Sequence, residues 1–490
     1  MSSALMVGVS GLRGVIGSSL SPDVCTRFAG SFAGWLIDHA AGRPVTIILA
    51  RDGRAGNAFV HHAACAGLLA AGVRVLDLGV AMTPTTAVLV DRHAADHPDH
   101  LVAGMVLTAS HNPQQWNGLK CLFADGRGLH GSSACAPSAP IAAQVAARFH
   151  ESRPALAPWS AIGSLSADVA SAAVHIARVA DALEDHGLAP DSWSVGNDLR
   201  IVVDSVNASG IVGARDLAER LGVDELLHLG CEPTGIFPHP PEPVAAHLDS
   251  LRDSVRESGA AVGFAQDPDA DRLAIVDEKG AYIGEEYTLV LGAIALLESM
   301  KQAGKPTKDA ALVVNLSTSR MIEDIAARYG ARVLRTAVGE ANVVETMKRE
   351  NAILGGEGNG GVIWPAVTYV RDSLSAMAMV MSLLRHTRTP LSSIVAGIPS
   401  YAIVKEKVDL ARKDDAAPAI DAIARAFAKE RVDRQDGVWV GLDAKRAWLH
   451  VRASNTEPIM RLIAEAPSEN EARALLAHAR QVIAEGSPSN

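Results

Sequence analysis

The chain has 490 residues and a formal net charge of −10, with 48% hydrophobic and only 4% aromatic residues. At about 150 residues per domain, this length predicts three or four domains with mainly aliphatic cores. The acidic balance and the lack of a strongly basic block argue against nucleic acid as the main partner, because binding to its backbone needs clustered Lys and Arg.

Hydropathy and cysteine usage favour a cytoplasmic protein. The sequence contains no run of about 18 apolar residues, so we expect no membrane span and no membrane partner. The first residues lack the charged start and long apolar region of a signal peptide. The five cysteines are far apart and form no C-x-x-C pair, which argues against a disulfide framework or a zinc site.

Strands and helices alternate over the first part of the chain. Residues 45–50 have the pattern of a buried strand, and an alanine-rich helix follows to about residue 71. Residues 73–79 form a second strand, Pro84 opens a second helix, and residues 104–107 form a third strand. This alternation predicts parallel βαβ units.

The alternation occurs twice more before the pattern changes. One round begins with a strand at 200–204, and another begins near residue 284. The last part of the chain instead mixes helices with strands near 401–408, 438–442 and 447–452. The sequence therefore predicts an α/β fold with three similar mixed α/β domains and a C-terminal α+β domain.

Composition places the first domain boundary. Residues from about 131 to 160 are rich in Ala, Ser and Pro, which is typical of a connecting segment. The predicted domains are 1–158, 159–283, 284–399 and 400–490.

Ser110 lies directly after the third predicted strand, in Thr-Ala-Ser-His-Asn-Pro at 108–113. A loop at the carboxyl end of a strand is where ligands bind in open α/β sheets. A serine nucleophile for acyl transfer would need a G-x-S-x-G elbow, which this segment lacks. A serine that carries a phosphate needs a metal ion and cations around it. Alternatively, Ser110 only caps a turn, and His111 and Asn112 support the loop.

Three carboxylates follow the strand at 261–265. Asp267, Asp269 and Asp271 alternate, so in an extended segment they share one face. Their charges repel one another unless a cation binds, and an all-oxygen ligand set suits Mg²⁺. Arg272, next in the chain, is placed to stabilise a metal-bound phosphate.

Two other functions are open for this acidic segment. One is a calcium-binding loop, but Arg272 stands where that loop needs glycine, and strands rather than helices flank the segment. The other is a phosphatase in which Asp267 is an aspartyl nucleophile.

Two further motifs carry hydrogen-bonding groups. Glu357 and Asn359 lie in the glycine-rich segment 356–361, where they can contact vicinal hydroxyls, unless the segment is a plain hairpin turn. Near the C-terminus, cationic and hydroxyl side chains suit a phosphate, unless the segment is only a polar loop. These side chains are Arg452, Ser454, Asn455, Thr456 and Arg461.

These motifs resemble those of the α-D-phosphohexomutases. The four matching segments are 108–113, 267–272, 356–361 and 452–458, in the order and spacing of that family. The resemblance spans essentially the whole chain and implies four domains around a central cleft. It also implies an enzyme that moves a phosphate between two positions of a hexose, as a monomer or homodimer.

The resemblance assigns roles to the residues that match. It implies a phosphoserine at Ser110, Mg²⁺ held by the phosphoserine and the three aspartates, and a sugar bisphosphate as activator and intermediate. Lys120 and Arg13 match residues for acid–base work and charge stabilisation near the serine. The remaining matches imply contacts to substrate: Glu357 and Asn359 to sugar hydroxyls, the loop from Thr336 to Gly339 to a specificity region, and Arg452, Ser454, Asn455 and Thr456 to the non-reacting phosphate.

The glycine-rich segment departs from the commonest family pattern, Glu-x-Ser-Gly-His. Asn359 replaces the serine, and Gly361 stands where the histidine would be. This turn is similar to that of archaeal-type phosphoglucosamine mutases, which implies glucosamine 6-phosphate as the favoured substrate. Phosphoglucomutase/phosphomannomutase activity is the alternative.

Overall fold

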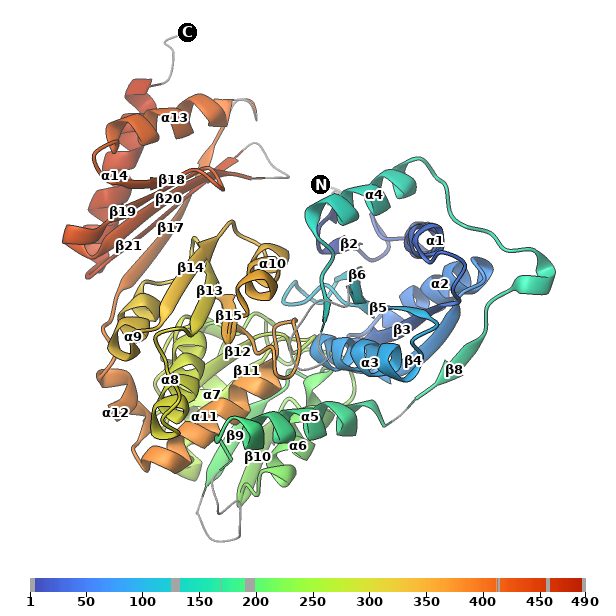
Figure 1. Cartoon of the computed structure of the whole chain (residues 1–490), viewed down its shortest axis with the longest axis horizontal. Coiled ribbons are helices and arrows are strands. Elements are labelled where there is room, and N and C mark those ends of the chain that lie inside the picture. Colours follow the sequence, from blue (N-terminus) through green and yellow to red (C-terminus); the bar gives the residue numbers. More distant parts are fainter. Residues whose placement is uncertain are drawn as a thin grey trace.

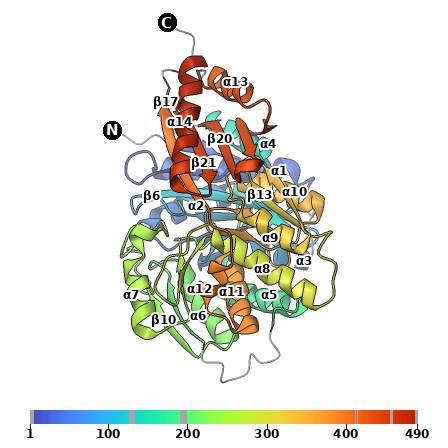
Figure 2. The ribbon, with the colours of Figure 1, turned by 90° about the vertical axis from the view of Figure 1, so that its left-hand side faces the viewer.

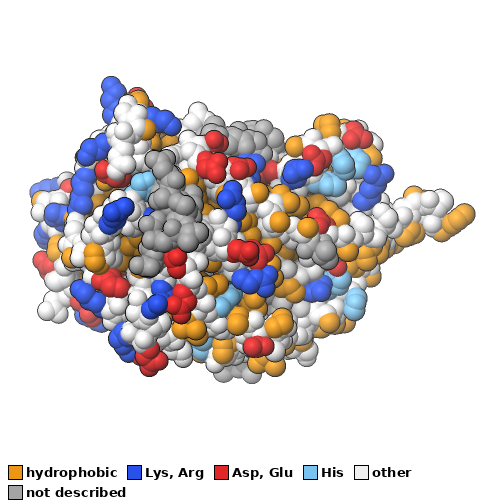
Figure 3. Space-filling model, turned by 90° about the horizontal axis from the view of Figure 1, so that it is seen from below, with side chains coloured by type: hydrophobic (Ala, Val, Ile, Leu, Met, Phe, Trp, Pro, Cys, Tyr) orange, Lys and Arg blue, Asp and Glu red, His pale blue; other side chains and the backbone are white. Residues whose placement is uncertain are grey.

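The computed structural model describes residues 5–124, 133–168, 170–189, 199–410, 412, 415–454 and 459–486. Four bodies follow one another in an arc, from the first sheet (blue) through the second (green) and third (yellow) to the C-terminal body (red) (Figure 1). No helix in the described parts of the chain is both long and apolar enough to span a membrane. On the face seen in Figure 3, Lys and Arg side chains are interspersed with Asp and Glu.

The first sheet has parallel strands at its centre. β3 lies between β4 and β5 and is parallel to both, and β6 is antiparallel to β5. The sheet has the order β1-β2-β6-β5-β3-β4-β8, with β7 beside β6. Its strands are β1 (Met6–Gly8), β2 (Gly11–Val15), β3 (Val45–Arg51), β4 (Arg74–Val80), β5 (Leu101–Leu107), β6 (Trp116–Ala124), β7 (Ala134–Cys135) and β8 (Leu165–Ala167). Its helices are α1 (Pro22–His39), α2 (Asn57–Ala70), α3 (Thr83–Asp96) and α4 (Ala139–His150).

The first sheet extends nine residues past the boundary predicted from composition at residue 158. β8 pairs with β4 in parallel, so the first sheet extends past residue 158. The connecting segment does contain a short 3-10 turn, η1 (Trp159–Ala161), with Trp159 almost fully exposed. Its composition is that of a linker, but the chain returns to the sheet edge once more before α5 (Ser171–Asp185).

The second and third sheets repeat the core of the first. Each has a central strand between two parallel neighbours and an antiparallel fourth strand, in the orders β10-β9-β11-β12 and β14-β13-β15-β16. The second sheet contains β9 (Arg200–Asp204), β10 (Glu225–Leu229), β11 (Val262–Gln266) and β12 (Leu273–Asp277). The third contains β13 (Ala311–Asn315), β14 (Arg332–Thr336), β15 (Leu354–Glu357) and β16 (Gly361–Ile363). The predicted similarity of the three domains is thus confirmed by strand order.

Helices cover these two sheets and link them. They are α6 (Gly210–Arg220), η2 (Ala245–His247), α7 (Asp249–Ser258), α8 (Tyr287–Gln302), α9 (Met321–Tyr329), α10 (Glu340–Glu350), α11 (Ser373–Thr387) and α12 (Leu391–Ala396). Apolar side chains of α5, α6, α8 and α11 pack into one cluster with those of both sheets. We call this cluster the shared core.

The C-terminal domain is a five-stranded antiparallel sheet with two helices on one face (Figures 1 and 2). Its order is β17-β21-β20-β19-β18. The strands are β17 (Ala402–Asp409), β18 (Arg431–Asp433), β19 (Val438–Leu442), β20 (Ala447–Ala453) and β21 (Ile459–Ala466), and the helices are α13 (Ala416–Ala426) and α14 (Glu469–Gly486). Of these strands, β18 and β21 were not predicted from the sequence. The other face packs Trp439, Trp448 and Ile463 against Leu316 of the third domain.

Glu465 lies in this interface and provides a test of it. One of its carboxylate oxygens accepts hydrogen bonds from the backbone N–H of Arg320 (2.9 Å) and the indole N–H of Trp448 (2.8 Å). Burial raises the pKa of Glu465 from 4.5 to about 7. The folded protein therefore holds this proton more tightly than the unfolded chain, and stability is lost as pH rises from about 4.5 to 7.

Glu465→Gln is expected to remove this loss. Thermal unfolding followed between pH 4.5 and pH 8 should show a smaller fall in midpoint temperature for Glu465→Gln than for wild type. Glu485→Gln, which changes an exposed carboxylate on α14, is the matched control and should follow wild type. If the unfolding midpoints of Glu465→Gln and Glu485→Gln change with pH in the same way, Glu465 is not the group that causes the loss of stability.

Candidate active site

Ser110 is held in a strained and buried loop after β5. Its backbone φ of 51° lies in the left-handed region, which is uncommon for a residue with a side chain. Its N–H donates to the Thr108 hydroxyl (2.8 Å), which in turn donates to Asp52 (2.7 Å). Its own hydroxyl donates to Asp267 Oδ2 at 2.7 Å. The loop thus presents the serine hydroxyl to the acidic segment of the second domain.

A buried arginine that the sequence analysis passed over fixes this loop. The Arg54 guanidinium is paired with Asp52 (Nε–Oδ2 2.7 Å) and donates to the carbonyls of Trp116 (2.7 Å) and Ser110. The signal available in the sequence was the Asp-Gly-Arg turn that directly follows the strand of residues 45–50. Because Arg54 joins the ends of β3, β5 and β6, it sets the position of the Ser110 backbone.

The three aspartates meet in a turn rather than in the extended segment that was predicted. Ala270 has a φ of 52°, and the N–H groups of Asp271 and Arg272 both donate to Asp267 Oδ1 at 3.1 Å. The turn brings one carboxylate oxygen of each aspartate within 4.8 Å of the others, and all three residues are fully buried. The carboxylates therefore converge because the chain curls, and not because of strand alternation.

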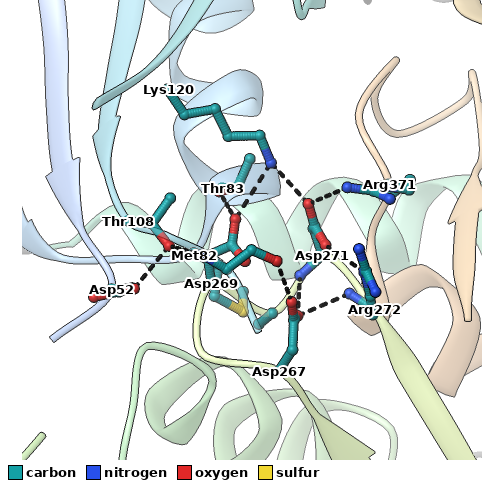
Figure 4. A network of polar contacts seen from close by, with 12 residues as sticks. Asp52, Met82, Thr83, Thr108, Lys120, Asp267, Asp269, Asp271, Arg272 and Arg371 are labelled. Atoms are coloured by element: carbon teal, nitrogen blue, oxygen red, sulfur yellow. Dashed lines mark hydrogen bonds and ion pairs between the residues drawn. The ribbon is translucent and has the colours of Figure 1, made fainter. Parts of the chain in front are cut away.

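Cations and a hydroxyl surround the cluster (Figure 4). Lys120 Nζ lies 2.7 Å from Asp271 Oδ2 and 3.3 Å from Asp269 Oδ2. Arg371 Nη2 also lies 2.7 Å from Asp271 Oδ2, and the Thr83 hydroxyl donates to Asp269 Oδ2 at 2.7 Å. The cluster thus receives partners from the first and third domains.

These surroundings separate the pKa values of the three carboxyls. Burial, with repulsion from Asp269 and Asp271, raises the pKa of Asp267 well above its ordinary value. Burial would also raise the pKa of Asp271, but Arg371 and Lys120 hold it below the ordinary range.

The cluster fits a hard divalent cation. Asp269 Oδ1 and Asp271 Oδ1 are buried and have no hydrogen-bond partner among the described residues. Carboxylate oxygens that converge in this way could hold Mg²⁺. A helix–loop–helix calcium site is contradicted, because the paired strands β11 and β12 flank the turn.

A cleft of about 440 Å³ lies beside the cluster and is lined from the first, second, third and C-terminal domains. The central cleft implied by the resemblance is therefore present. Seven of the residues singled out from the sequence line it: Arg13, Lys120, Arg272, Gly339, Glu357, Asn359 and Arg452.

The sites around Ser110 are close to this cleft. Arg13 donates to the Asn112 side chain at 3.1 Å. His111 Nδ1 lies 3.3 Å from Ser110 Oγ. Burial, with the nearby charges of Arg272 and Arg13, lowers the pKa of His111 to about 3, so its imidazole is neutral at pH 7.

The glycine-rich segment is a hairpin turn between β15 and β16 and also a wall of the cleft. One oxygen of Glu357 accepts from Asn315 Nδ2 and the other from Arg371 Nη1, both at 2.9 Å. Asn359 Nδ2 lies 3.5 Å from the same carboxylate. The segment is thus a hairpin turn, and Glu357 and Asn359 also line the cleft.

Asp436 connects the Thr336–Gly339 loop to the C-terminal domain. Its Oδ2 accepts from the N–H of Val338 at 3.1 Å and lies 3.5 Å from Arg452 Nη1. Thr336 itself is buried, and its hydroxyl donates to the carbonyl of Ala337.

The other residues near the C-terminus that were predicted to bind phosphate fall into three groups. Ser454 is buried, and its N–H donates to the carbonyl of Ile459 at 2.9 Å. Arg461 is exposed on β21, directly opposite Arg452 in the strand register. Asn455 and Thr456 lie outside the described residues.

Four family models match successive parts of the chain. They describe the α/β/α domains I, II and III and the C-terminal domain of phosphoglucomutase/phosphomannomutase, and they match residues 4–135, 186–280, 289–401 and 406–482. The chain belongs to the phosphoglucomutase/phosphomannomutase family. It is a phosphohexomutase, which supersedes the phosphatase and calcium-protein alternatives.

Similar phosphohexomutases cover almost the whole chain. A "probable phosphoglucosamine mutase" of Methanopyrus kandleri is 33% identical over 472 residues, which are 96% of this chain and 95% of that protein. A "phosphoglucomutase/phosphomannomutase" of Thermococcus kodakarensis is 30% identical over 475 residues, 96% of each protein. A solved structure of a phosphoglucomutase/phosphomannomutase family protein from Burkholderia thailandensis has a TM-score of 0.79 at 25% identity and covers 100% of this chain and 99% of that one. The two named relatives differ in the sugar phosphate in their names.

Proposed function

We propose that this phosphohexomutase interconverts hexose 6-phosphate and hexose 1-phosphate through a phosphoserine at Ser110 and a sugar bisphosphate. The supporting observation is the 2.7 Å hydrogen bond from the Ser110 hydroxyl to Asp267, inside a buried acidic cluster at the cleft. Mg²⁺ bound to this cluster and to the phosphoserine would neutralise charge on the transferring phosphoryl group.

Each half-reaction exchanges one P–O bond for another. The bond between phosphorus and the serine oxygen breaks while phosphorus bonds to the free hydroxyl oxygen of the sugar. The proton lost by this hydroxyl is balanced by the proton that the released serine oxygen takes up. The bisphosphate then turns over in the cleft and returns its other phosphate to Ser110. Burial alone would lower the pKa of Lys120, but Asp271 and Asp269 raise it, so the ammonium stays charged. With Arg13 and Arg272, Lys120 supplies positive charge where the phosphoryl group moves.

We assign the other motif residues to binding of the sugar phosphate. Glu357 and Asn359 contact the hydroxyls, Thr336–Gly339 forms the specificity loop, and Arg452 binds the non-reacting phosphate together with Ser454, Asn455, Thr456 and Arg461. Contacts from the C-terminal domain also close the cleft to water, which would otherwise hydrolyse the activated phosphate.

Glucosamine 6-phosphate is the substrate we favour. Support comes from the turn that combines Asn359 with Gly361 and from the name of the Methanopyrus relative. Glucose and mannose phosphates are the alternative, which the Thermococcus relative supports by its name. The test is kcat/KM for glucosamine, glucose and mannose phosphates with Mg²⁺ and a trace of bisphosphate. A preference for glucose or mannose phosphate would overturn the glucosamine assignment.

Arg452→Ala is expected to raise KM at least about tenfold, because a hydrogen bond to a charged phosphate is lost in the ground state and transition state alike. Steady-state kinetics with the best of the three substrates measures this. Arg473→Ala, which removes an exposed arginine of α14 that is paired only with Glu469 among the described contacts, is the control. Equal KM values for wild type and Arg452→Ala would remove Arg452 from the phosphate site.

A further inference from the structure

Arg371 joins three loops of the cleft, and none of the motifs includes it. It lies just before α11, is buried, and lines the cleft. Its Nη2 lies 2.7 Å from Asp271, its Nη1 2.9 Å from Glu357, and its Nε 2.8 Å from Glu340. One guanidinium therefore contacts the acidic cluster, the glycine-rich turn and the residue that follows Gly339.

Gly361 makes room for this arginine. A Cβ atom added at Gly361 would lie 2.2 Å from Cδ and 2.9 Å from Cγ of Arg371, closer than any carbon–carbon contact allows. Gly361 is not among the glycines with positive φ, so its backbone does not require glycine. Glycine is required at this position because the Arg371 side chain occupies the space that a Cβ atom would take. A side chain at position 361 and the stem of Arg371 exclude each other.

We propose that Arg371 is the positioning residue of the sugar site and fills the place left by the histidine that is missing at Gly361. It acts on substrate through Glu357. Both oxygens of that carboxylate are fixed, one by Asn315 and one by Arg371, so its plane is set and its remaining lone pairs point in defined directions. The fork of the guanidinium is needed for this role, because a lysine ammonium is a point charge and cannot span three carboxylates in fixed geometry.

The first experiment measures KM and kcat for the substrate that wild type prefers. Arg371→Ala and Arg371→Lys are expected to raise KM about tenfold or more. Gly361→Ala keeps every charge but pushes the Arg371 stem, and it should raise KM in the same direction. Arg385→Ala is the control, since this arginine lies near the other end of α11 and donates to the carbonyls of Leu221 and Gly222. KM values within twofold of wild type for both Arg371→Ala and Gly361→Ala overturn the proposal.

The second experiment tests mutual exclusion directly. Gly361→His is expected to impair the wild-type enzyme and to lower KM in the Arg371→Ala background, where the space is free. This reversal of sign is a coupling that two independent structural defects would not produce. An equal loss in both backgrounds overturns the proposal.

The KM measurements rest on the proposed function. Thermal unfolding tests the role of Arg371 independently of that function. If wild type turns over none of the three sugar phosphates, the proposed function fails. The unfolding midpoint then decides on Arg371: Gly361→His should destabilise the wild-type chain and not the Arg371→Ala chain. A destabilisation of equal size in both chains overturns the inference.

Discussion

Ser110→Ala is expected to abolish turnover of every hexose phosphate, with a loss in kcat of more than about 10⁴-fold, because the proposed mechanism has no other group that can carry the phosphate. The substitution keeps Cβ, so the left-handed backbone at this position is no more strained than before. It removes one hydrogen bond to Asp267 and leaves the Arg54 contacts to the loop in place.

The loss must be chemical and not structural. Circular dichroism and thermal unfolding should match wild type, and intact-mass measurement after incubation with a sugar bisphosphate should show a phosphate on wild type only. Ser205→Ala is the matched control: this serine follows β9 in the second repeat, and its hydroxyl donates to Gln266. Residual turnover by Ser110→Ala at a few per cent of wild type would rule out the phosphoserine mechanism.

Asp267→Asn is expected to lower kcat more than about 10³-fold, since a bound metal contributes several kcal/mol to charge stabilisation. The same substitution should stabilise the metal-free protein against unfolding. The pKa of Asp267 is raised by burial and by repulsion from Asp269 and Asp271, so removing its charge relieves that repulsion. In EDTA, the variant should therefore unfold at a higher temperature than wild type.

Added Mg²⁺ separates the two effects. It should raise the unfolding temperature of wild type and restore its activity after EDTA, and it should do neither for Asp267→Asn. Asp253→Asn, which changes an exposed carboxylate on α7, is the control and should respond to Mg²⁺ as wild type does. The same Mg²⁺ response in Asp267→Asn would show that the ion does not bind at this cluster.

The sequence predicts those parts of this enzyme that depend on residues close together in the chain. Alternating apolar strands and helices predict the three repeats, and the topology confirms them. Short motifs identify Ser110, the three aspartates and the glycine-rich turn, because each motif is contiguous in the chain. β21 was missed because the charged residues Arg461 and Glu465 interrupt the apolar pattern of Ile459–Ala466.

Long-range partners have no local pattern. Arg371 contacts Asp271 one hundred residues earlier in the chain, and Arg54 contacts the carbonyl of Ser110 fifty-six residues later. Nothing around Arg371 in the sequence distinguishes it from a surface arginine, and the Asp-Gly-Arg turn that contains Arg54 does not show which groups this arginine contacts. The turn of the acidic segment could not be predicted either, because it depends on hydrogen bonds from backbone N–H groups to the Asp267 carboxylate.

The shared core has a consequence for how the chain matures during synthesis. The cluster between the first sheet and helices α1, α2 and α4 is complete once Phe149 has been made. The shared core beneath the second and third sheets includes Leu391 and Ile398, more than a hundred residues after the acidic turn. Since domains fold as units once their cores are complete, the ribosome exposes Asp267, Asp269 and Asp271 well before their support exists. If synthesis pauses or stops between the second and third repeats, the acidic second repeat is left without part of its hydrophobic core. The two repeats therefore fold as a single unit.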